Sequence, residues 1–242
     1  MRKICRLSIL AVLSLALFGC HANTAPDAAP DPRPEAAASS AAAAPGPAAV
    51  PTPAAHSNDP RPLLVCFGDS LTAGLGTGPG ESYPDYLQTD LDQLRYNYRV
   101  VNRGISGDTT KDGVERLPEV LALRPAVVVV EFGGNDGLRG LRIEDTRDNL
   151  DKIVGQLKDS GAKVALAGIT LPPDYGPDYV QQFDQTYRLL AKKYRVPMLP
   201  FLLRNVYGVP GLMQRDNTHA TARGNQVVAR DVVPLVLPLL KK

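Results

Sequence analysis

Ser70 is the residue of this 242-residue chain best placed to act as a nucleophile. It lies in Gly68-Asp69-Ser70-Leu71, directly after the apolar run 63–67. Such a run, bounded by turn residues, predicts a buried strand. A serine just past a buried strand is held by a rigid element and is still exposed at a loop, as a nucleophile must be. The alternative is a turn serine that caps the next helix.

His219 is the one histidine in the part of the chain that we expect to fold, because His21 and His56 lie in an Ala/Pro-rich segment. Nucleophilic catalysis by serine needs a base that takes the hydroxyl proton and an acid group that holds this base in one tautomer. Asp216 precedes His219 by three residues, which lets its carboxylate reach the imidazole. A surface or capping histidine is the alternative. Together with Ser70, the pair predicts a Ser-His-Asp triad.

Two glycine-containing segments could supply hydrogen-bond donors for an oxyanion. Residues 102–109 include Gly107 and follow the second predicted strand, and glycines there allow backbone N–H groups to approach a ligand closely. Gly133-Gly134-Asn135-Asp136 follows the third predicted strand and offers a side-chain amide. Turn formation alone is the alternative for both. Because parallel strands end at one edge of a sheet, we expect Ser70, Gly107 and Asn135 to converge there.

Five apolar segments are predicted to form the strands that position these residues. Their ranges are 63–67, 99–102, 126–132, 163–169 and 196–199. The continuous valine run 127–130 is typical of a parallel strand that is covered on both faces.

Helical patterns separate these segments. Ser82 is a predicted cap with Pro84 in the first turn, and Asp145 is a predicted cap of a helix that Gly161 ends. The apolar residues of this second helix recur at helical spacing: Leu150, Ile153, Val154 and Leu157. A third helix covers about 178–194, and the last starts at Thr221 and is bent or broken by Pro234 and Pro238. The alternation predicts an α/β fold with a doubly wound, mainly parallel five-stranded sheet.

The first 60 residues are predicted to lie outside the folded domain. Residues 1–20 combine a basic start with an apolar stretch, as in a secretory signal, and end in Leu17-Phe18-Gly19-Cys20. This end resembles the bacterial lipoprotein box, in which Cys20 would be lipidated; an ordinary signal peptide is the alternative. Residues 21–60 contain 15 Ala and 9 Pro without an aromatic residue, so they are predicted to be a disordered tether. We therefore expect a lipid-anchored protein of the cell envelope that faces the periplasm or the cell surface.

Residues 61–242 are enough for one domain with a core. The net charge of +2, without a basic stripe, argues against a nucleic-acid partner. Cys66 stands alone inside the first predicted strand, so we expect it to be buried and unpaired. One histidine without a cysteine cluster does not make a usual zinc site, and we expect neither a metal nor another cofactor.

Two other functional classes are alternatives to a hydrolase. A nucleotide-binding loop is suggested by the glycines at 74, 76, 78 and 80, but Pro79 and Glu81 occupy the positions where the dinucleotide motif needs glycine. A surface lipoprotein that binds acyl or sugar ligands without turnover is the other, although no residue needed for turnover is missing.

The chain resembles the SGNH (GDSL) hydrolases, and among them the bacterial thioesterase I, lysophospholipase and arylesterase branch. The resemblance extends in order over about 63–240. Its motifs are Gly68-Asp69-Ser70-Leu71, Ile105-Ser106-Gly107-Asp108-Thr109, Gly133-Gly134-Asn135-Asp136-Gly137-Leu138-Arg139-Gly140, Leu171-Pro172 with Tyr175-Gly176, and Asp216-x-x-His219. One departure is Ala220, where the family usually has proline after the histidine. That change is expected to loosen the His219 loop without removing a catalytic atom.

The resemblance implies a flavodoxin-like three-layer sandwich and a role for each motif residue. Ser70 would be the nucleophile, His219 the base and then the acid, and Asp216 its orienting partner. The oxyanion donors would be the backbone N–H groups of Ser70 and Gly107 and the side chain of Asn135. Asp69 and Asp136 would hold the donor loops, and residues 137–141 would form a mobile loop over the acyl site.

The resemblance also implies a carboxylic ester hydrolase that forms an acyl-enzyme. Acyl esters of lipids, including lysolipids, or of small alcohols are the expected substrates, with possible arylesterase and thioesterase activity. Carbohydrate O-acetyl esters are the alternative. Export would remove acyl-CoA from reach, so thioesterase activity would be a capacity of the site and not its duty. We expect a monomer.

Overall fold

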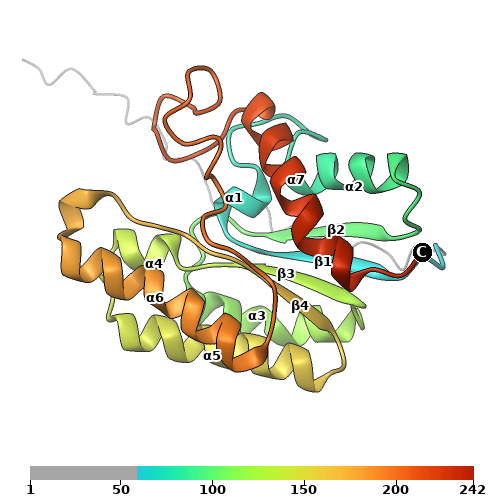
Figure 1. The fold of residues 1–242 in the computed structure, drawn as a ribbon, viewed down its shortest axis with the longest axis horizontal. Coiled ribbons are helices and arrows are strands. Elements are labelled where there is room, and N and C mark those ends of the chain that lie inside the picture. Colours follow the sequence, from blue (N-terminus) through green and yellow to red (C-terminus); the bar gives the residue numbers. More distant parts are fainter. Residues whose placement is uncertain (1–58) are drawn as a thin grey trace, which may run out of the picture. The chain divides into compact units, whose positions relative to one another are not determined.

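The computed structural model describes residues 59–242, and these form a five-stranded sheet with helices on both faces (Figure 1). The predicted signal peptide, the predicted lipidation site Cys20 and almost all of the predicted tether lie outside the described residues. Every neighbouring pair of strands in the sheet is parallel. The predicted fold class is therefore confirmed.

All five predicted strands are present, with small differences at their ends. They are β1 (Leu63–Gly68), β2 (Arg99–Gly104), β3 (Val127–Glu131), β4 (Lys163–Ala167) and β5 (Met198–Leu199). β2 is two residues longer than predicted because Gly104 still pairs with Gly68 at the end of β1. β4 stops before Gly168, where the backbone approaches the Pro200 carbonyl too closely to leave room for a Cβ atom.

The strand order β2-β1-β3-β4-β5 places a change of direction beside β1. The chain first adds β2 on one side of β1 and then returns to add β3 on the other side. In open α/β sheets, ligands bind outside the carboxyl ends of the strands at such a switch point. The segments that follow β1 and β3, which contain Ser70 and Asn135, border this position.

The longer helices form the two outer layers (Figure 1). One face carries α2 (Tyr83–Gln93) and α7 (Ala222–Val236). The other carries α3 (Thr110–Ala122), α5 (Ile143–Asp159) and α6 (Pro177–Tyr194). The short helices α1 (Ser70–Ala73) and α4 (Gly134–Leu138) directly follow β1 and β3, and 3₁₀ turns cover Pro173–Tyr175 and Leu237–Leu239.

One predicted helix boundary is wrong. α5 begins at Ile143 with Arg142 at its N-cap, so Asp145 lies in the first turn instead of capping the helix. A carboxylate at that position still interacts favourably with the positive end of the helix dipole. α7 begins after Thr221 as predicted, continues through Pro234 without a break there, and ends at Val236, before Pro238.

Helix α3 was not predicted, because Gly113 and Pro118 interrupt its pattern and both residues disfavour a helix interior. Its start did carry a signal in the sequence. Thr109 and Asp112 form a capping box, in which each side chain accepts from the other residue's backbone N–H. Tertiary packing of the buried face, which includes Gly113 itself, outweighs the low propensity.

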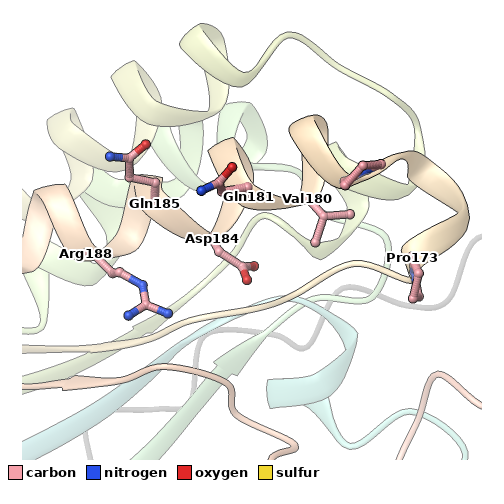
Figure 2. Close-up of a pocket in the computed structure, with 7 residues that line it drawn as sticks. Pro173, Val180, Gln181, Asp184, Gln185 and Arg188 are labelled. Atoms are coloured by element: carbon pink, nitrogen blue, oxygen red, sulfur yellow. The ribbon is translucent and has the colours of Figure 1, made fainter.

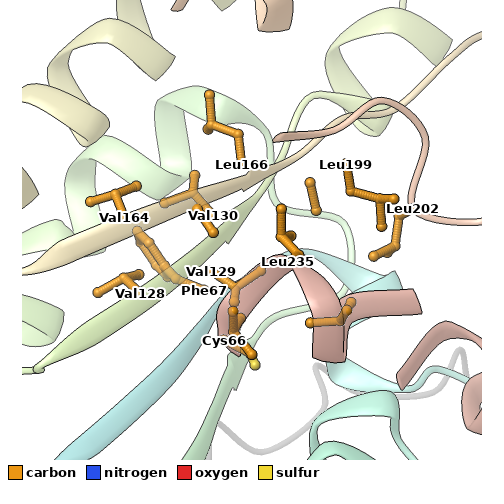
Figure 3. Packing of buried hydrophobic residues seen from close by; sticks show 14 of the residues in the cluster. Cys66, Phe67, Val128, Val129, Val130, Val164, Leu166, Leu199, Leu202 and Leu235 are labelled. Atoms are coloured by element: carbon orange, nitrogen blue, oxygen red, sulfur yellow. The ribbon is translucent and has the colours of Figure 1, made fainter. Parts of the chain in front are cut away.

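The core lies between the sheet and the helices, with apolar side chains of β1, β3 and β4 at its centre (Figure 3). The three buried strands consist mostly of apolar residues, as expected for a parallel sheet covered on both faces. Cys66 is buried and free, as predicted, and its burial raises the pKa of the thiol to about 12. It therefore packs as a small apolar side chain.

Gly104 at the end of β2 is required for close packing of α1. A Cβ atom there would lie 2.2 Å from the Ala73 backbone nitrogen and 2.6 Å from the Thr72 carbonyl carbon. We expect Gly104→Ala to lower the free energy of unfolding by roughly 1–3 kcal/mol or more, since backbone atoms cannot yield as a side chain does. Thermal unfolding measures this, at about 2–4 °C in Tm per kcal/mol. Gly78→Ala is the control, because its Cβ would meet only the end of the flexible Glu81 side chain; equal Tm values would contradict the prediction.

Candidate active site

Ser70 is the first residue of α1 and follows β1 after a single residue. The Asp69 carboxylate caps this helix by accepting a hydrogen bond of 3.0 Å from the Leu71 backbone N–H. Gly74 ends the helix in the left-handed conformation, with a φ of 79°. Ser70 is thus held at a tight strand-to-helix turn and is 8% exposed. The capping role that the sequence left open for Ser70 belongs to Asp69.

The structure brings Ser70, His219 and Asp216 together in one hydrogen-bonded chain. His219 Nε2 lies 2.8 Å from Ser70 Oγ, although 149 residues separate them in sequence. His219 Nδ1 lies 2.7 Å from Asp216 Oδ2. A hydroxyl, a base within hydrogen-bonding distance and a carboxylate that orients the base are the parts that an activated serine requires.

Asp216 is an anion at neutral pH. Desolvation raises its pKa, but the hydrogen bonds from the His219 side chain and from the backbone N–H groups of Thr218 and His219 outweigh this and lower it to about 2. Both N–H groups donate to Asp216 Oδ1, at 3.0 and 3.1 Å, which leaves Oδ2 for the imidazole. An anion on this side favours the tautomer with a proton on Nδ1, and Nε2 is then free to accept the Ser70 proton.

Gln214, which the sequence analysis missed, holds the loop that carries His219. Its backbone N–H donates to the His219 carbonyl at 2.8 Å, and its side-chain amide donates to the carbonyls of Ala220 and Leu75, at 2.9 and 2.7 Å. The loop is therefore anchored even though Ala220 replaces the proline that is usual in the family. Nothing in the local sequence distinguishes Gln214 from an ordinary surface glutamine.

Asn135 connects the two segments that were predicted to donate to an oxyanion. Its Nδ2 donates to the Asp108 carbonyl at 2.9 Å and to Asp69 Oδ2 at 3.2 Å. Gly107 precedes Asp108 and has a φ of 89°, a conformation that favours glycine. Within 59–242, the backbone N–H groups of Ser70 and Gly107 donate to no protein group. Both are available to a ligand oxygen, as an oxyanion site requires.

Asp69 and Asp136 occupy the positioning places predicted for them. Asp69 joins the start of α1 to the Asn135 amide, as described above. Asp136 accepts hydrogen bonds from the Thr110 backbone N–H at 2.9 Å and from Thr146 Oγ1 at 3.2 Å. It thereby fixes α4 to the starts of α3 and α5. Burial raises the pKa of Asp69 to about 6.

Arg116 on α3 is a second residue that the sequence analysis missed. Its guanidinium forms an ion pair with Asp108 at 2.6 Å and donates to the Arg103 and Gly68 carbonyls, each at 3.3 Å. It also lies over the Phe67 ring, 5.0 Å from its centroid. Arg116 thus ties the ends of β1 and β2 to the Gly107 turn. It was missed because its helix was missed.

A cavity of about 230 Å³ opens beside Ser70 and His219. Its wall is mostly apolar and includes Leu75, Leu138, Ile169, Leu171, Pro172, Phe201, Leu203 and Tyr207. Asn135 also lines it, whereas Gly107 does not and is connected to it through Asp108. An apolar cavity with a few convergent polar groups suits a small organic ligand with one reactive polar centre.

Residues 137–141, predicted to be a mobile loop, begin inside α4, which ends at Leu138. Leu138 lines the cavity. Three side chains fix the segment: Tyr175 donates to the Leu138 carbonyl at 3.1 Å, Tyr179 to the Leu141 carbonyl at 2.8 Å, and Arg139 to the Gly107 carbonyl at 2.8 Å. Mobility of this segment stays a prediction.

A larger cavity of about 680 Å³ runs along α6 (Figure 2). Its wall includes Val180, Gln181, Asp184, Gln185 and Arg188, and Figure 2 shows these side chains along one helix. None of the residues predicted to do chemistry lines it. The smaller cavity beside Ser70 is therefore the candidate active site.

In residues 59–242, no group of three His, Cys, Asp or Glu side chains is arranged to hold a metal ion. None of the helices in the described part of the chain is long and apolar enough to cross a membrane.

Characterised proteins resemble this chain over most of its length. An esterase of Pseudomonas aeruginosa named TesA is 42% identical over 178 residues, which cover 73% of this chain and 89% of the relative. The thioesterase 1/protease 1/lysophospholipase L1 of Escherichia coli is 38% identical over 73% of this chain and 84% of its own. An arylesterase of Vibrio mimicus is 38% identical over 70% and 85% of the two chains.

Solved structures give the same result. The crystal structure of TesA matches with a TM-score of 0.71 and 42% identity, over 74% of this chain and 99% of that one. AlinE4, described as an SGNH-hydrolase family esterase, matches with a TM-score of 0.63 and 39% identity, over 75% and 98%. The model of the GDSL-like lipase/acylhydrolase family matches residues 66–227. With the site geometry and these similarities together, the chain belongs to the GDSL-like lipase/acylhydrolase family, the SGNH hydrolases.

Proposed function

We propose that this protein is a serine esterase that hydrolyses carboxylic esters through an acyl-enzyme. The observation that carries the proposal is the hydrogen-bonded chain of Ser70, His219 and Asp216 beside an apolar cavity. The family and the names of the relatives support the same activity. A ligand-binding protein without turnover would have no need of an aligned hydroxyl, imidazole and carboxylate.

In the first half of the reaction, Ser70 Oγ attacks the ester carbonyl carbon while His219 Nε2 takes the hydroxyl proton. The carbonyl oxygen becomes an oxyanion, which the N–H groups of Ser70 and Gly107 and the Asn135 amide stabilise. His219 then gives its proton to the leaving alcohol as the carbon–oxygen bond breaks. In the second half, water attacks the acyl-enzyme with His219 as base, the acid leaves and Ser70 regains its proton.

The cavity supports acyl esters of lipids or of small alcohols as the substrates. Its mostly apolar wall offers burial to an acyl chain at roughly 25 cal/mol per Å². Thioester and lysophospholipid hydrolysis are activities that the name of the Escherichia coli relative records for that protein. For this chain they are further capacities of the same site, and carbohydrate O-acetyl esters are the alternative substrate class.

A panel of p-nitrophenyl esters of increasing chain length, with a lysophospholipid and an acetylated sugar, tests the proposal on the purified protein. We expect turnover of the simple esters, higher kcat/KM for acyl chains that enter the cavity, and none with Ser70→Ala. Ligand binding without turnover would show a binding protein instead. A preference for the acetylated sugar over every acyl ester would favour the alternative substrate class.

Leu138 provides a specific test of the cavity as the acyl site, because it lines the cavity and is 43% exposed. We expect Leu138→Ser to lower kcat/KM for p-nitrophenyl octanoate by about tenfold, which corresponds to the loss of one apolar contact with the acyl chain. The value for p-nitrophenyl acetate should change little. Leu189→Ser is the matched control, since Leu189 is 44% exposed on α6 and does not line this cavity. Equal losses for both esters would contradict the assignment.

We also propose that the protein is held at a membrane of the bacterial cell envelope by a lipid on Cys20. The support is the predicted signal and lipoprotein box at the N-terminus. Replacing Cys20 by serine would then move the protein from the membrane fraction to the soluble fraction. Retention of the variant at the membrane would count against the anchor.

A further inference from the structure

Glu131, the last residue of β3, is a carboxyl group that the proposed reaction does not use. It is 0% exposed. Its Oε2 atom accepts hydrogen bonds from Thr72 Oγ1 at 2.7 Å and from the Asp69 backbone N–H at 3.3 Å. Its Oε1 atom is buried and has no hydrogen-bond partner among the described residues. A buried polar atom without a partner needs a physical explanation.

The surroundings of Glu131 are unsuited to a carboxylate anion. The titratable groups around it are the Asp69 carboxyl from the strand-to-helix turn, the Cys66 thiol of β1, the Tyr83 phenol of α2 and the Tyr187 phenol of α6. None of these carries a positive charge. Within 59–242, no lysine, arginine or histidine forms an ion pair with Glu131.

The Arg116 guanidinium does not pair with Glu131. Arg116 reaches the Gly68 carbonyl beside Glu131, but its ion pair is with Asp108. Burial and the charge of Asp136 disfavour the anion of Asp69, and His219 favours that anion when its imidazole is protonated. Burying an unpaired carboxylate beside a second carboxyl is costly on both counts, desolvation and like charge.

A proton on Glu131 Oε1 removes both difficulties. It abolishes the buried charge, and it changes an acceptor without a donor into a donor. Asp69 is the neighbouring group that can accept it: its backbone N–H already donates to Glu131 Oε2 at 3.3 Å, and a side-chain hydrogen bond between the two carboxyl groups is one cause of the raised pKa of Glu131. Burial, and then the charge of Asp69, raise the pKa of Glu131 well above its ordinary value, which agrees with the geometry.

We propose that Glu131 is a positioning residue of this site: a neutral carboxylic acid at neutral pH that donates its proton to Asp69 and, through Asp69, sets the Asn135 amide for the oxyanion. The inference rests on the proposed function. Asn135 Nδ2 gives its two hydrogens to the Asp108 carbonyl and to Asp69 Oδ2, so an oxyanion must compete with one of these acceptors, and the contact with Asp69 is the longer of the two. A proton donated by Glu131 draws charge from Asp69, which weakens it as a competitor without breaking its hold on α1.

Glu131→Gln tests the neutral state without any assay of activity, because an amide keeps the shape and a donor but cannot ionise. An acid whose pKa is raised by folding keeps its proton in the folded state, while the unfolded chain loses it above about pH 4.5. The free energy of unfolding of the wild type should therefore fall as pH rises from there toward the raised pKa. This part of the fall should be absent in Glu131→Gln. The stability of the variant relative to the wild type should therefore increase as the pH rises.

The matched control is Glu119→Gln, the same chemical change at an exposed position of α3. Its stability difference from the wild type should not vary with pH in that range. The infrared carbonyl band of a neutral carboxylic acid should be visible at pH 7 in the wild type and in Glu119→Gln, and should be lost in Glu131→Gln. A pH-independent deficit of Glu131→Gln, or no such band in the wild type, would show that Glu131 is ionised and overturn the proposal.

Ester hydrolysis tests the link to Asn135. At pH 7, Glu131→Gln should keep kcat within about threefold of the wild-type value. It should also keep this kcat up to a higher pH than the wild type does. Glu131→Ala should lower kcat by on the order of tenfold with little change in KM. An equal loss of kcat in both variants would overturn the positioning role. A rise in KM without a change in kcat for Glu131→Ala would overturn it as well. Should Glu131→Ala fail to fold, the pH profile of Glu131→Gln still decides the matter. The stability and infrared results stand even if the protein proves not to be an esterase.

Discussion

Alanine at Ser70 is expected to lower kcat for ester hydrolysis by on the order of 10⁴- to 10⁶-fold, and alanine at His219 by a similar factor. Each change removes one end of the 2.8 Å contact between Ser70 Oγ and His219 Nε2. Without the hydroxyl no acyl-enzyme forms, and without the imidazole the hydroxyl keeps its proton. The double variant should be hardly worse than either single one, because the two groups act as a unit.

Kinetic assays of the three variants with one p-nitrophenyl ester provide the measurement. Ser160→Ala is a suitable control, because its hydroxyl bonds only the Leu157 carbonyl at the end of α5 and lies outside the cavity. Thermal unfolding should show all variants folded, since among residues 59–242 the side chain of Ser70 forms a hydrogen bond with His219 alone. Losses that multiply in the double variant, or a Ser70→Ala protein with substantial turnover, would contradict the proposed pairing.

Alanine at Asn135 is expected to lower kcat by on the order of 10²- to 10³-fold while KM changes little. The amide should bind the oxygen more strongly as its negative charge develops, so its loss should affect the transition state more than the bound ester. The N–H groups of Ser70 and Gly107 remain in the variant. This leaves part of the oxyanion stabilisation and makes the expected loss smaller than for Ser70.

The difficulty with Asn135→Ala is that the amide also holds Asp69 and the Asp108 carbonyl in place. Asn149→Ala is a matched control, because Asn149 donates to Thr110 at the start of α3 without lining the cavity. It should leave kcat within about threefold of the wild type. A similar loss of kcat in both variants would assign Asn135 a structural role instead of a donor role. A rise in KM without a change in kcat for Asn135→Ala would do the same.

The parts of the fold that were predicted correctly depend on local patterns. The valines of β3 and the spaced apolar residues of α5 show burial directly, because periodicity along the chain matches the geometry of each element. Helix α3 was missed because Pro118 and Gly113 act against it locally, while the packing that stabilises it comes from distant residues. Arg116 was missed with it, although it fixes three segments of the site.

The sequence by itself determined the chemistry that this protein can carry out. Ser70 after a buried strand, and Asp216 three residues before His219, are local arrangements, and local spacing fixes which functional groups are available. Only the tertiary structure decided how those groups are used. The contact across 149 residues, the apolar wall of the cavity and the burial of Glu131 without a cation all arise from segments that meet only in the folded chain. Burial and hydrogen-bond partners depend on neighbours in space, so no pattern along the sequence could have shown that the turn containing Ser70 donates hydrogen bonds to a buried carboxyl group.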